Sequence, residues 1–252
     1  MAFDLKGQAI LVTGGGRGIG RGTAELLAAS GAVVGIADID PASSQEAAEA
    51  IRAAGGEAHA YAGDISRREA FMDVADAFAA AAGRIDGVVN SAMWIHYEPV
   101  SEITEETFDK MLAVGLKAPV WGTQAVLKHM DPARGAAVVN FSSPAADQGY
   151  PNTSVYAAVK GAVGTITRSL AVELGPRGVR VNAITPGPVP TPGARAIVDE
   201  AGYEVRRRKT PLGRLGTEED IANAIAFLFS KEAAFITGAI LHVDGGCSLT
   251  AS

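Results

Sequence analysis

The sequence holds a single cysteine, Cys247, among its 252 residues. One thiol cannot form an intrachain disulfide, and it cannot build a cysteine-rich metal site. The histidines are scattered along the chain without the spacing of metal ligands: His59, His96, His129 and His242. We therefore expect no required metal, with each histidine serving packing or the surface.

Long apolar runs and an excess of basic residues are also missing. No segment reaches the roughly 18 uninterrupted apolar residues of a membrane helix, and the start, MAFDLKGQAILVTGGG, lacks the pattern of a secretory leader. Lys and Arg number 22 against 28 Asp and Glu, a net charge of −6, which argues against a nucleic-acid partner. We expect a cytoplasmic protein that binds neither membranes nor nucleic acid.

What the sequence does contain is a regular alternation of short β-branched runs with longer alanine-rich stretches. The first strand-like runs are QAILVTG, AVVGIAD, EAHAYAGD and IDGVVNSA. This rhythm predicts an α/β fold, a doubly wound parallel sheet of about seven strands with helices on both faces. Because no repeat, linker or low-complexity tract divides the chain, residues 1–252 are expected to form a single domain.

Two later stretches are harder to classify from their pattern. One long helix is expected from about Thr104 to Met130. The stretch 188–209 shows no clear period, and we interpret it as an irregular substrate loop or lid.

A glycine-rich turn follows the first predicted strand. The sequence TGGGRGIG, residues 13–20, runs directly into a predicted helix. Glycines there permit a tight turn and let the backbone N–H groups at the helix N-terminus approach a pyrophosphate. This context predicts a dinucleotide-binding, Rossmann-type site, with these candidate residues: Gly14, Gly16, Arg17, Gly18, Ile19 and Gly20.

An acidic residue completes this signal. Asp38 lies 18 residues after Gly20, at the end of the second predicted strand, where a carboxylate could accept hydrogen bonds from an adenosine ribose. A carboxylate at that point would repel the extra phosphate of NADP, so we predict NAD, with NADP as the less favoured cofactor. Arg17 could attract that phosphate, but it could equally pack over the adenine or meet solvent.

Asp64 and Ile65, after the third strand, could contact the adenine. The alternative for Asp64 is a structural one, as the N-cap of a helix that starts near Ser66.

Tyr156 and Lys160 stand four residues apart in a small-residue helix, TSVYAAVKGAV. Residues at this spacing lie on one helical face, so the phenol and the ammonium can reach a common point. Taken alone, the pair is more typical of a solvated amphipathic helix than of a catalytic site. Only the rest of the chain can decide between the two interpretations.

The motifs together resemble the short-chain dehydrogenase/reductase family over nearly the whole chain. They are the loop TGGGRGIG, a Ser143 thirteen residues before Tyr156, the segment NAITPGPVPT and the ending GRLGTEEDIANAIAFLFSKEAAFITGAILHVDGG. The resemblance implies hydride transfer between a nicotinamide cofactor and an alcohol or ketone, catalysed by Ser143, Tyr156 and Lys160. It also implies a homotetramer, or at least a dimer. Further cofactor contacts that it implies are Asn90, Tyr156, Lys160, Pro186, Gly187, Val189 and Thr191.

The catalytic assignment is physically sensible. An ammonium about 5 Å from a phenolate would favour the ionised phenol by roughly 3 kcal/mol, or about two pKa units. We therefore expect Lys160 to lower the pKa of Tyr156, and Ser143 to donate a hydrogen bond to the reacting oxygen. Ser142 is expected to point the other way and to be structural.

The chain departs from the family pattern at two positions. The family's Asn-Asn-Ala-Gly is here NSAM, with Met93 in place of glycine. The family's catalytic asparagine is replaced by Gly115, in AVGLKAP, which keeps a backbone carbonyl but no side chain. We expect an active enzyme with a modified proton relay. The alternatives are a weakly active or inactive cofactor-binding relative and an enzyme similar to 3-oxoacyl carrier-protein reductases.

The substrate pocket is expected among the loops beyond the strands. Aromatic and apolar residues there predict an apolar or ring-bearing alcohol or ketone, although some of them could merely pack the loops: Met93, Trp94, Tyr97, Pro144 and Tyr150. The run RRRK at 206–209 could attract an anionic or carrier-bound substrate, but such a run is more often solvated.

Overall fold

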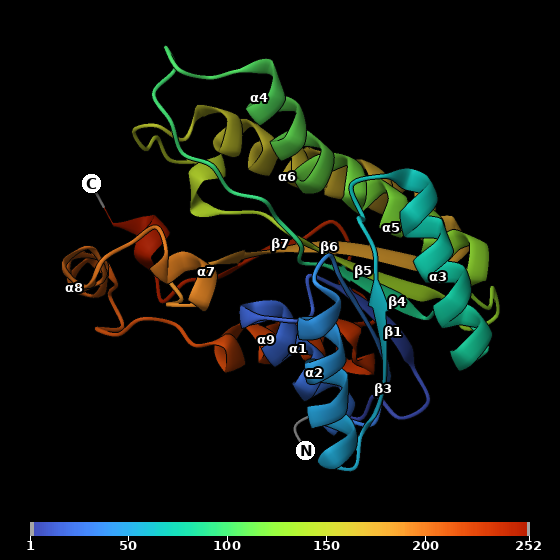
Figure 1. The fold of residues 1–252 in the computed structure, drawn as a ribbon. Helices are drawn as coiled ribbons and strands as arrows, with labels where there is room; N and C mark the ends of the chain where they lie inside the picture. Colours follow the sequence, from blue (N-terminus) through green and yellow to red (C-terminus); the bar gives the residue numbers. More distant parts are fainter. Residues whose placement is uncertain (1–2, 251–252) are drawn as a thin grey trace.

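The computed structural model describes residues 3–250 and contains one parallel sheet of seven strands between two layers of helices (Figure 1). The strand order is β3-β2-β1-β4-β5-β6-β7, and every neighbouring pair is parallel. The strands are β1 (Ala9–Thr13), β2 (Val33–Asp38), β3 (Glu57–Ala62), β4 (Gly87–Asn90), β5 (Ala136–Phe141), β6 (Val179–Pro186) and β7 (Ile240–Val243). This confirms the predicted doubly wound α/β fold.

The central strands are buried throughout because helices cover both of their faces. Every residue of β1 (AILVT) and of β4 (GVVN) is buried. Continuous apolar runs of this kind are typical of parallel strands, whereas a sheet with one wet face would alternate.

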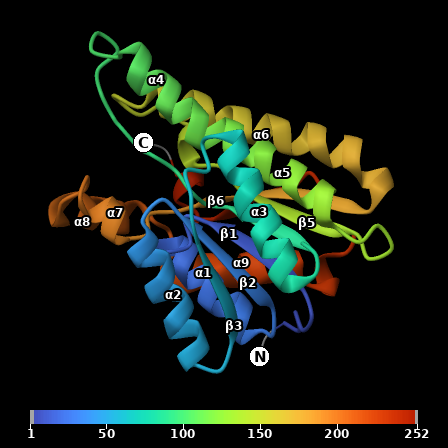
Figure 2. The same ribbon diagram turned by 45° about the vertical axis from the view of Figure 1, so that its right-hand side comes forward.

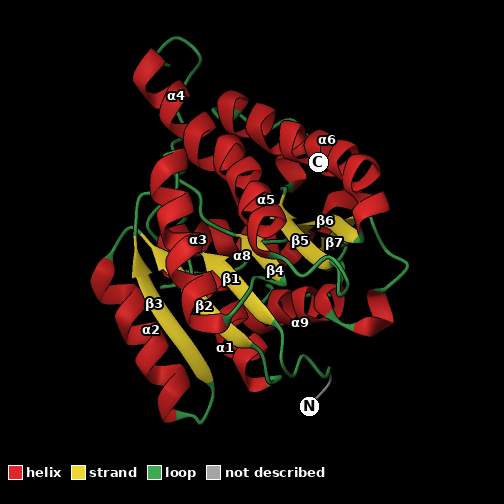
Figure 3. Ribbon diagram, turned by 90° about the vertical axis from the view of Figure 1, so that its right-hand side faces the viewer, coloured by secondary structure: helices red, strands yellow, loops and turns green. Residues whose placement is uncertain are grey.

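The helices form two layers, one on each face of the sheet (Figures 1 and 3). One layer contains α1 (Gly18–Ala29), α2 (Pro41–Ala53) and α9 (Glu218–Phe229). The other contains α3 (Arg68–Ala82), α5 (Ala118–His129) and α6 (Ser154–Leu174). Each layer buries its own apolar cluster against the sheet, around Leu27 and Ile225 on one side and Phe78 and Val126 on the other.

Local sequence signals explain where several helices begin. The Asp40 side chain accepts a hydrogen bond from the Ala42 amide, and Pro41 takes the first helical position of α2. At α9, Thr217 and Asp220 form a reciprocal capping box.

The expected long helix from Thr104 to Met130 is interrupted. The chain forms α4 (Glu105–Leu112), then a π-helical turn (Ala113–Lys117), then α5. Pro119 gives the physical reason, because it has no N–H to donate to the carbonyl of Gly115 and its ring would crowd that carbonyl in a regular helix. The wider π-helical turn relieves the conflict, and α4 extends beyond the sheet (Figure 2).

The stretch 188–209 is also more regular than expected. It contains the short helix α7 (Pro192–Arg195) and the longer α8 (Glu200–Lys209). The Thr191 side chain caps α7 by accepting a hydrogen bond from the Ala194 amide, and the Asp199 side chain caps α8 by accepting one from the Gly202 amide. The pattern was hidden because α8 is polar almost all round, with only Tyr203 buried. Both helices lie at one side of the sheet (Figure 2).

Neither a membrane-crossing helix nor a metal-binding cluster is found in residues 3–250. No helix in this range combines the length and the apolar character that a crossing would need. Within the same range, no three His, Cys, Asp or Glu side chains gather as a metal site would require.

Candidate active site

A cleft of about 1450 Å³ opens at the carboxyl ends of the central strands. The strands β1, β4, β5 and β6 end there, at the edge where open α/β sheets bind their ligands. It brings together most of the residues singled out from the sequence. Those that line it are Gly14, Arg17, Gly18, Ile19, Gly20, Asp38, Asp64, Ile65, Met93, Trp94, Tyr97, Ser143, Pro144, Tyr150, Tyr156, Lys160, Pro186, Gly187, Val189 and Thr191.

The glycine turn after β1 is tightly packed backbone. A Cβ at Gly20 would lie 2.1 Å from the carbonyl oxygen of Gly14, and Gly14 itself has a φ of +63°. Side chains at either position would therefore force the turn open. Because the turn leads into the N-terminus of α1 and faces the cleft, its shape fits the pyrophosphate of a dinucleotide.

Asp38 ends β2 at one end of the cleft. Its carboxylate accepts hydrogen bonds from the amides of Gly16 (3.0 Å) and Asp40 (3.1 Å), which fix its orientation. The nearby Arg17 side chain is largely exposed and forms an ion pair with Asp40. Arg17 is therefore already paired with a carboxylate, which weakens it as a partner for a phosphate.

Asp64 also lines the cleft, and the structure does not use it as an N-cap. Its carboxylate accepts hydrogen bonds from the Ser66 amide (3.1 Å) and the Ser66 hydroxyl (2.6 Å) within a turn. The helix α3 begins only at Arg68, with Arg67 at its N-cap position. The structural alternative for Asp64 is thus wrong in detail.

Two predicted cofactor contacts lie outside the cleft lining. Asn90 is buried, and its side-chain amide donates a hydrogen bond to the side-chain oxygen of Asn140 at 2.8 Å. This bond holds the Asn90 side chain between the sheet and the helices, away from the cleft. Gly16 faces Ser43 and Asp38 instead. Ser91, the residue after Asn90, is the one that reaches the cleft.

Ser143, Tyr156 and Lys160 converge from two elements. Ser143 follows the end of β5, and the other two lie on the first turns of α6. Lys160 is 5% exposed, and its ammonium donates to the carbonyl of Phe141 at 2.8 Å. The same ammonium lies 5.7 Å from the centre of the Tyr156 ring.

Ser142 anchors the two elements to each other. Its hydroxyl donates to the backbone carbonyl of Lys160 at 3.1 Å. This bond fixes α6 against the end of β5, which agrees with the structural role predicted for the Ser142 hydroxyl, although Ser142 also lines the cleft.

The expected lowering of the Tyr156 pKa is wrong. Burial raises the pKa of the Tyr156 phenol, and the hydroxyls of Ser143 and Tyr97 offset that effect only in part. Burial likewise lowers the pKa of Lys160 to about 8, and its ammonium is directed to Phe141. The expected lowering applies to a moderately solvated pair of Tyr156 and Lys160. Both side chains are buried here, and desolvation has the larger effect on their pKa values.

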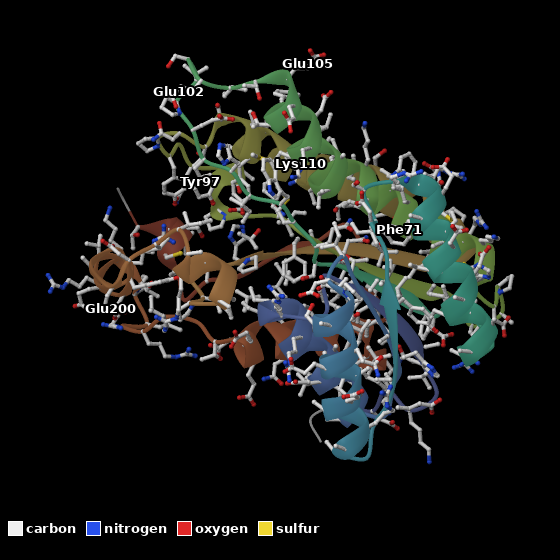
Figure 4. All side chains as sticks on the ribbon, viewed as in Figure 1. Phe71, Tyr97, Glu102, Glu105, Lys110 and Glu200 are labelled. Atoms are coloured by element: carbon white, nitrogen blue, oxygen red, sulfur yellow. The ribbon has the colours of Figure 1, made fainter. Side chains whose placement is uncertain are left out.

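Aromatic side chains form the end of the cleft beyond Tyr156. The Tyr97 ring meets the Tyr156 ring edge-on, with centroids 5.4 Å apart and an interplanar angle of 82°. Trp94 stacks on His96 and carries the Lys110 ammonium 4.4 Å from its ring centre. These contacts tie the loop after β4 to α4, where Figure 4 shows Tyr97 and Lys110.

The sequence reasoning did not assign several residues that line this end of the cleft. They are Lys110, Arg206, Lys209 and Cys247. Only the run at 206–209 carried a signal, which was its positive charge. Whether its side chains face the cleft or the solvent could not be known from the sequence. Lys110 and Cys247 belong to none of the motifs, so the sequence gave no signal for either, although Cys247 directly follows the final motif HVDGG.

The comparison with known proteins now identifies the family. A family model described as "Enoyl-(Acyl carrier protein) reductase" matches residues 14–248. The chain belongs to the short-chain dehydrogenase/reductase family. An uncharacterized oxidoreductase of Thermotoga maritima is 38% identical over 251 residues, covering 97% of this chain and 98% of the relative.

Solved structures of short-chain dehydrogenases/reductases share the fold. A 7α-hydroxysteroid dehydrogenase complexed with NADH and 7-oxoglycochenodeoxycholic acid has a TM-score of 0.93 at 30% identity, over 96% of this chain and 95% of its own. A protein provisionally assigned as an NAD(P)-dependent gluconate 5-dehydrogenase of Beutenbergia cavernae, with NADP at low occupancy, has a TM-score of 0.92 at 34% identity, over 99% and 100%. Nicotinamide cofactors therefore bind to this fold in relatives.

The two departures from the pattern of short-chain dehydrogenases/reductases meet in space. Gly115 lies in the π-helical turn, and a Cβ there would be 2.8 Å from the sulfur of Met93 and 2.5 Å from Val159. The Met93 side chain thus occupies the space beside Gly115. The two substitutions are complementary, because a larger residue at one position is accommodated by a smaller one at the other.

Proposed function

We propose that this protein is an NAD-dependent oxidoreductase that interconverts a secondary alcohol and a ketone of apolar or ring-bearing type. The observation that carries the proposal is the convergence of Ser143, Tyr156 and Lys160 in one cleft with the glycine turn. Three polar groups so placed have no packing purpose in common, whereas proton transfer at a carbonyl oxygen can use an acid/base, a hydrogen-bond donor and a positive charge together.

Each residue has a distinct part in the proposed reaction. Tyr156 exchanges a proton with the substrate oxygen, and Ser143 donates a hydrogen bond to that oxygen. Lys160, positioned by the carbonyl of Phe141, supplies positive charge beneath the phenol when it is protonated. The bound nicotinamide would supply or accept the hydride.

The raised pKa of Tyr156 affects which direction of the reaction is favoured at a given pH. A phenol with a raised pKa stays protonated near neutral pH. Ketone reduction needs this form, because the phenol must give its proton to the oxygen. Alcohol oxidation needs the ionised form, so we propose that reduction is favoured at neutral pH and oxidation at higher pH.

The cofactor choice rests on Asp38. Its carboxylate is held at the edge of the cleft by two backbone amides, where it can accept from ribose hydroxyls and repel a 2′-phosphate. Relatives carry either NADH or NADP, so the preference belongs to this chain's own residues.

We expect the protein to bind NADH more tightly than NADPH, and Asp38→Ala to narrow that gap. Fluorescence titration of both cofactors measures the affinities, and a panel of secondary alcohols and ketones with each cofactor measures turnover. Equal affinities in the unaltered protein would contradict the Asp38 argument. Cofactor binding without turnover across the panel would instead favour a binding or regulatory relative.

We also propose a homotetramer, or at least a dimer, built on the α5 and α6 layer. The outer face of α6 carries small residues, Ala157, Ala158 and Gly161, and an apolar Val172 that is 81% exposed. Small residues let a second helix approach closely, and exposed apolar area gains from being covered. Light scattering that gave the mass of one chain at micromolar concentration would contradict this assembly.

The segment 188–209 remains our candidate for a substrate lid. Its residues Val189, Thr191, Arg206 and Lys209 line the cleft from the side opposite α4.

A further inference from the structure

The charged side chains that line the cleft differ between its two ends. Near the glycine turn, at the end assigned to the adenosine, lie Asp38, Asp64 and Arg17, which is paired with Asp40. Beyond Tyr156 the charged lining residues are Lys110, Arg206 and Lys209, and no described Asp or Glu joins them there. We call these three residues the cationic end of the cleft. It stands out in a chain whose net charge is −6.

The helix α8 separates its four cations into two kinds. Arg207 and Arg208 form ion pairs with Glu204 on their own helix. Arg206 and Lys209 form no ion pair with any residue in the described range 3–250 and line the cleft instead. Half of the basic run is thus neutralised within the helix. The other two cations are exposed and line the cleft, and the Arg206 guanidinium also lies 6.0 Å from the centre of the Tyr203 ring on the same helix.

The third cation is held from the opposite wall. Lys110 lies on α4, where its ammonium rests on the Trp94 ring, and it too lacks an ion-pair partner within the range that the structure describes. Figure 4 shows Lys110 and Tyr97 on the α4 side, across from the α8 side marked by Glu200. Cations from two separate elements therefore approach one space.

Arg206 lies among the groups that would contact a substrate. Its charge lowers the pKa values of Tyr97, Tyr150 and Cys247, each of which burial raises. Tyr97 in turn packs edge-on against Tyr156. Arg206 therefore lies near the aromatic ring that packs against the proposed acid/base.

We propose that the cationic end selects substrates that carry an anionic group beyond the reacting carbonyl, with Arg206 as its principal partner. This inference rests on the proposed function. The aromatic rings would hold the body of the substrate, and the guanidinium would pair with a carboxylate, sulfonate or phosphate in a bidentate manner. Lys110 and Lys209, exposed point charges at the same end, would add attraction that salt screens.

The test compares an anionic ketone with a neutral one of the same shape, 4-oxocyclohexanecarboxylate and its methyl ester. We expect the unaltered protein to favour the carboxylate in kcat/KM by about tenfold, the loss typical of one charge-assisted hydrogen bond. Arg206→Gln should remove that preference by raising KM for the carboxylate alone. Arg208→Gln, which removes the same charge from a position paired with Glu204, should leave it unchanged.

A second pair distinguishes the source of the anion. Acetoacetyl-coenzyme A carries phosphates, whereas the acetoacetyl thioester of N-acetylcysteamine carries no charge. A preference confined to the coenzyme A thioester, and lost in Arg206→Gln, places the anion on a carrier. A preference confined to the carboxylate places it on a free keto acid. Raising the salt concentration should weaken either preference.

Binding separates a failure of this inference from a failure of the proposed function. Calorimetric titration of 4-oxocyclohexanecarboxylate into the Tyr156→Phe protein with NADH needs no turnover. Weaker binding in the Tyr156→Phe, Arg206→Gln double variant supports the cationic end even if no ketone is reduced. Equal kcat/KM for the charged and neutral members of both pairs, or equal effects of Arg206→Gln and Arg208→Gln, would overturn it.

Discussion

Tyr156→Phe is expected to lower kcat at least about a hundredfold while NADH affinity stays nearly unchanged. Proton transfer by a positioned side chain contributes about 10² to 10⁴ in rate, and the substitution removes the oxygen that carries the proton and little else. The Phe ring keeps the packing against Tyr97 and against Val155 and Val159. Steady-state kinetics and a fluorescence titration of NADH measure the two quantities.

Tyr97→Phe is the matched control, because it removes the same atom from the neighbouring ring. The Tyr97 hydroxyl lowers the pKa of Tyr156, so its removal should raise that pKa further. Alcohol oxidation needs the ionised Tyr156, and its rise with pH should therefore move to higher pH. Turnover should survive. If Tyr156→Phe kept most of its activity, or if the two variants lost equal activity, Tyr156 would not be the acid/base.

Gly115→Asn, which restores the usual residue of the family, is expected to damage this protein. Its Cβ would lie 2.5 Å from Val159 and 2.8 Å from the Met93 sulfur, and neither contact is tolerable without movement. Overpacking of this kind costs about 1–3 kcal/mol of unfolding free energy. We expect a lower melting temperature and a substrate KM that changes more than cofactor affinity, because Met93 lines the cleft.

A double-mutant cycle tests whether Met93 is the cause. Met93→Ala should recover part of the stability that Gly115→Asn loses, so the two changes should not be additive. Additive losses would place the strain elsewhere, at Val159 or in the π-helical turn. Higher activity of Gly115→Asn alone would show instead that the missing side chain, and not the space it left, limits the enzyme.

The sequence predicted the architecture because its signals are local. Buried runs such as AILVT mark parallel strands. In the glycine turn, Gly14 and Gly18 have positive φ angles, and a Cβ at Gly20 would meet the carbonyl of Gly14. The roles of Ser143, Tyr156 and Lys160 were implied by the family resemblance that the motifs carry, and the cleft brings these residues together with Asp38.

The features that were not predicted have different causes. The π-helical turn has a local cause in Pro119, which the expectation of one continuous helix did not take into account. The raised pKa of Tyr156 depends on how completely α6 is covered. The position of Arg206 beside the cleft depends on how α8 lies against the rest of the fold, which the sequence does not show.

Transfer of deuterium tests the central claim most directly. NADH that carries deuterium at both hydrogen positions of nicotinamide C4 is incubated with the protein and the best ketone of the panel, and the product alcohol is examined by mass spectrometry. The account predicts one deuterium at the carbinol carbon in the unaltered protein, and almost none at equal times in Tyr156→Phe. An alcohol product without the label, or no alcohol from any ketone, would contradict it.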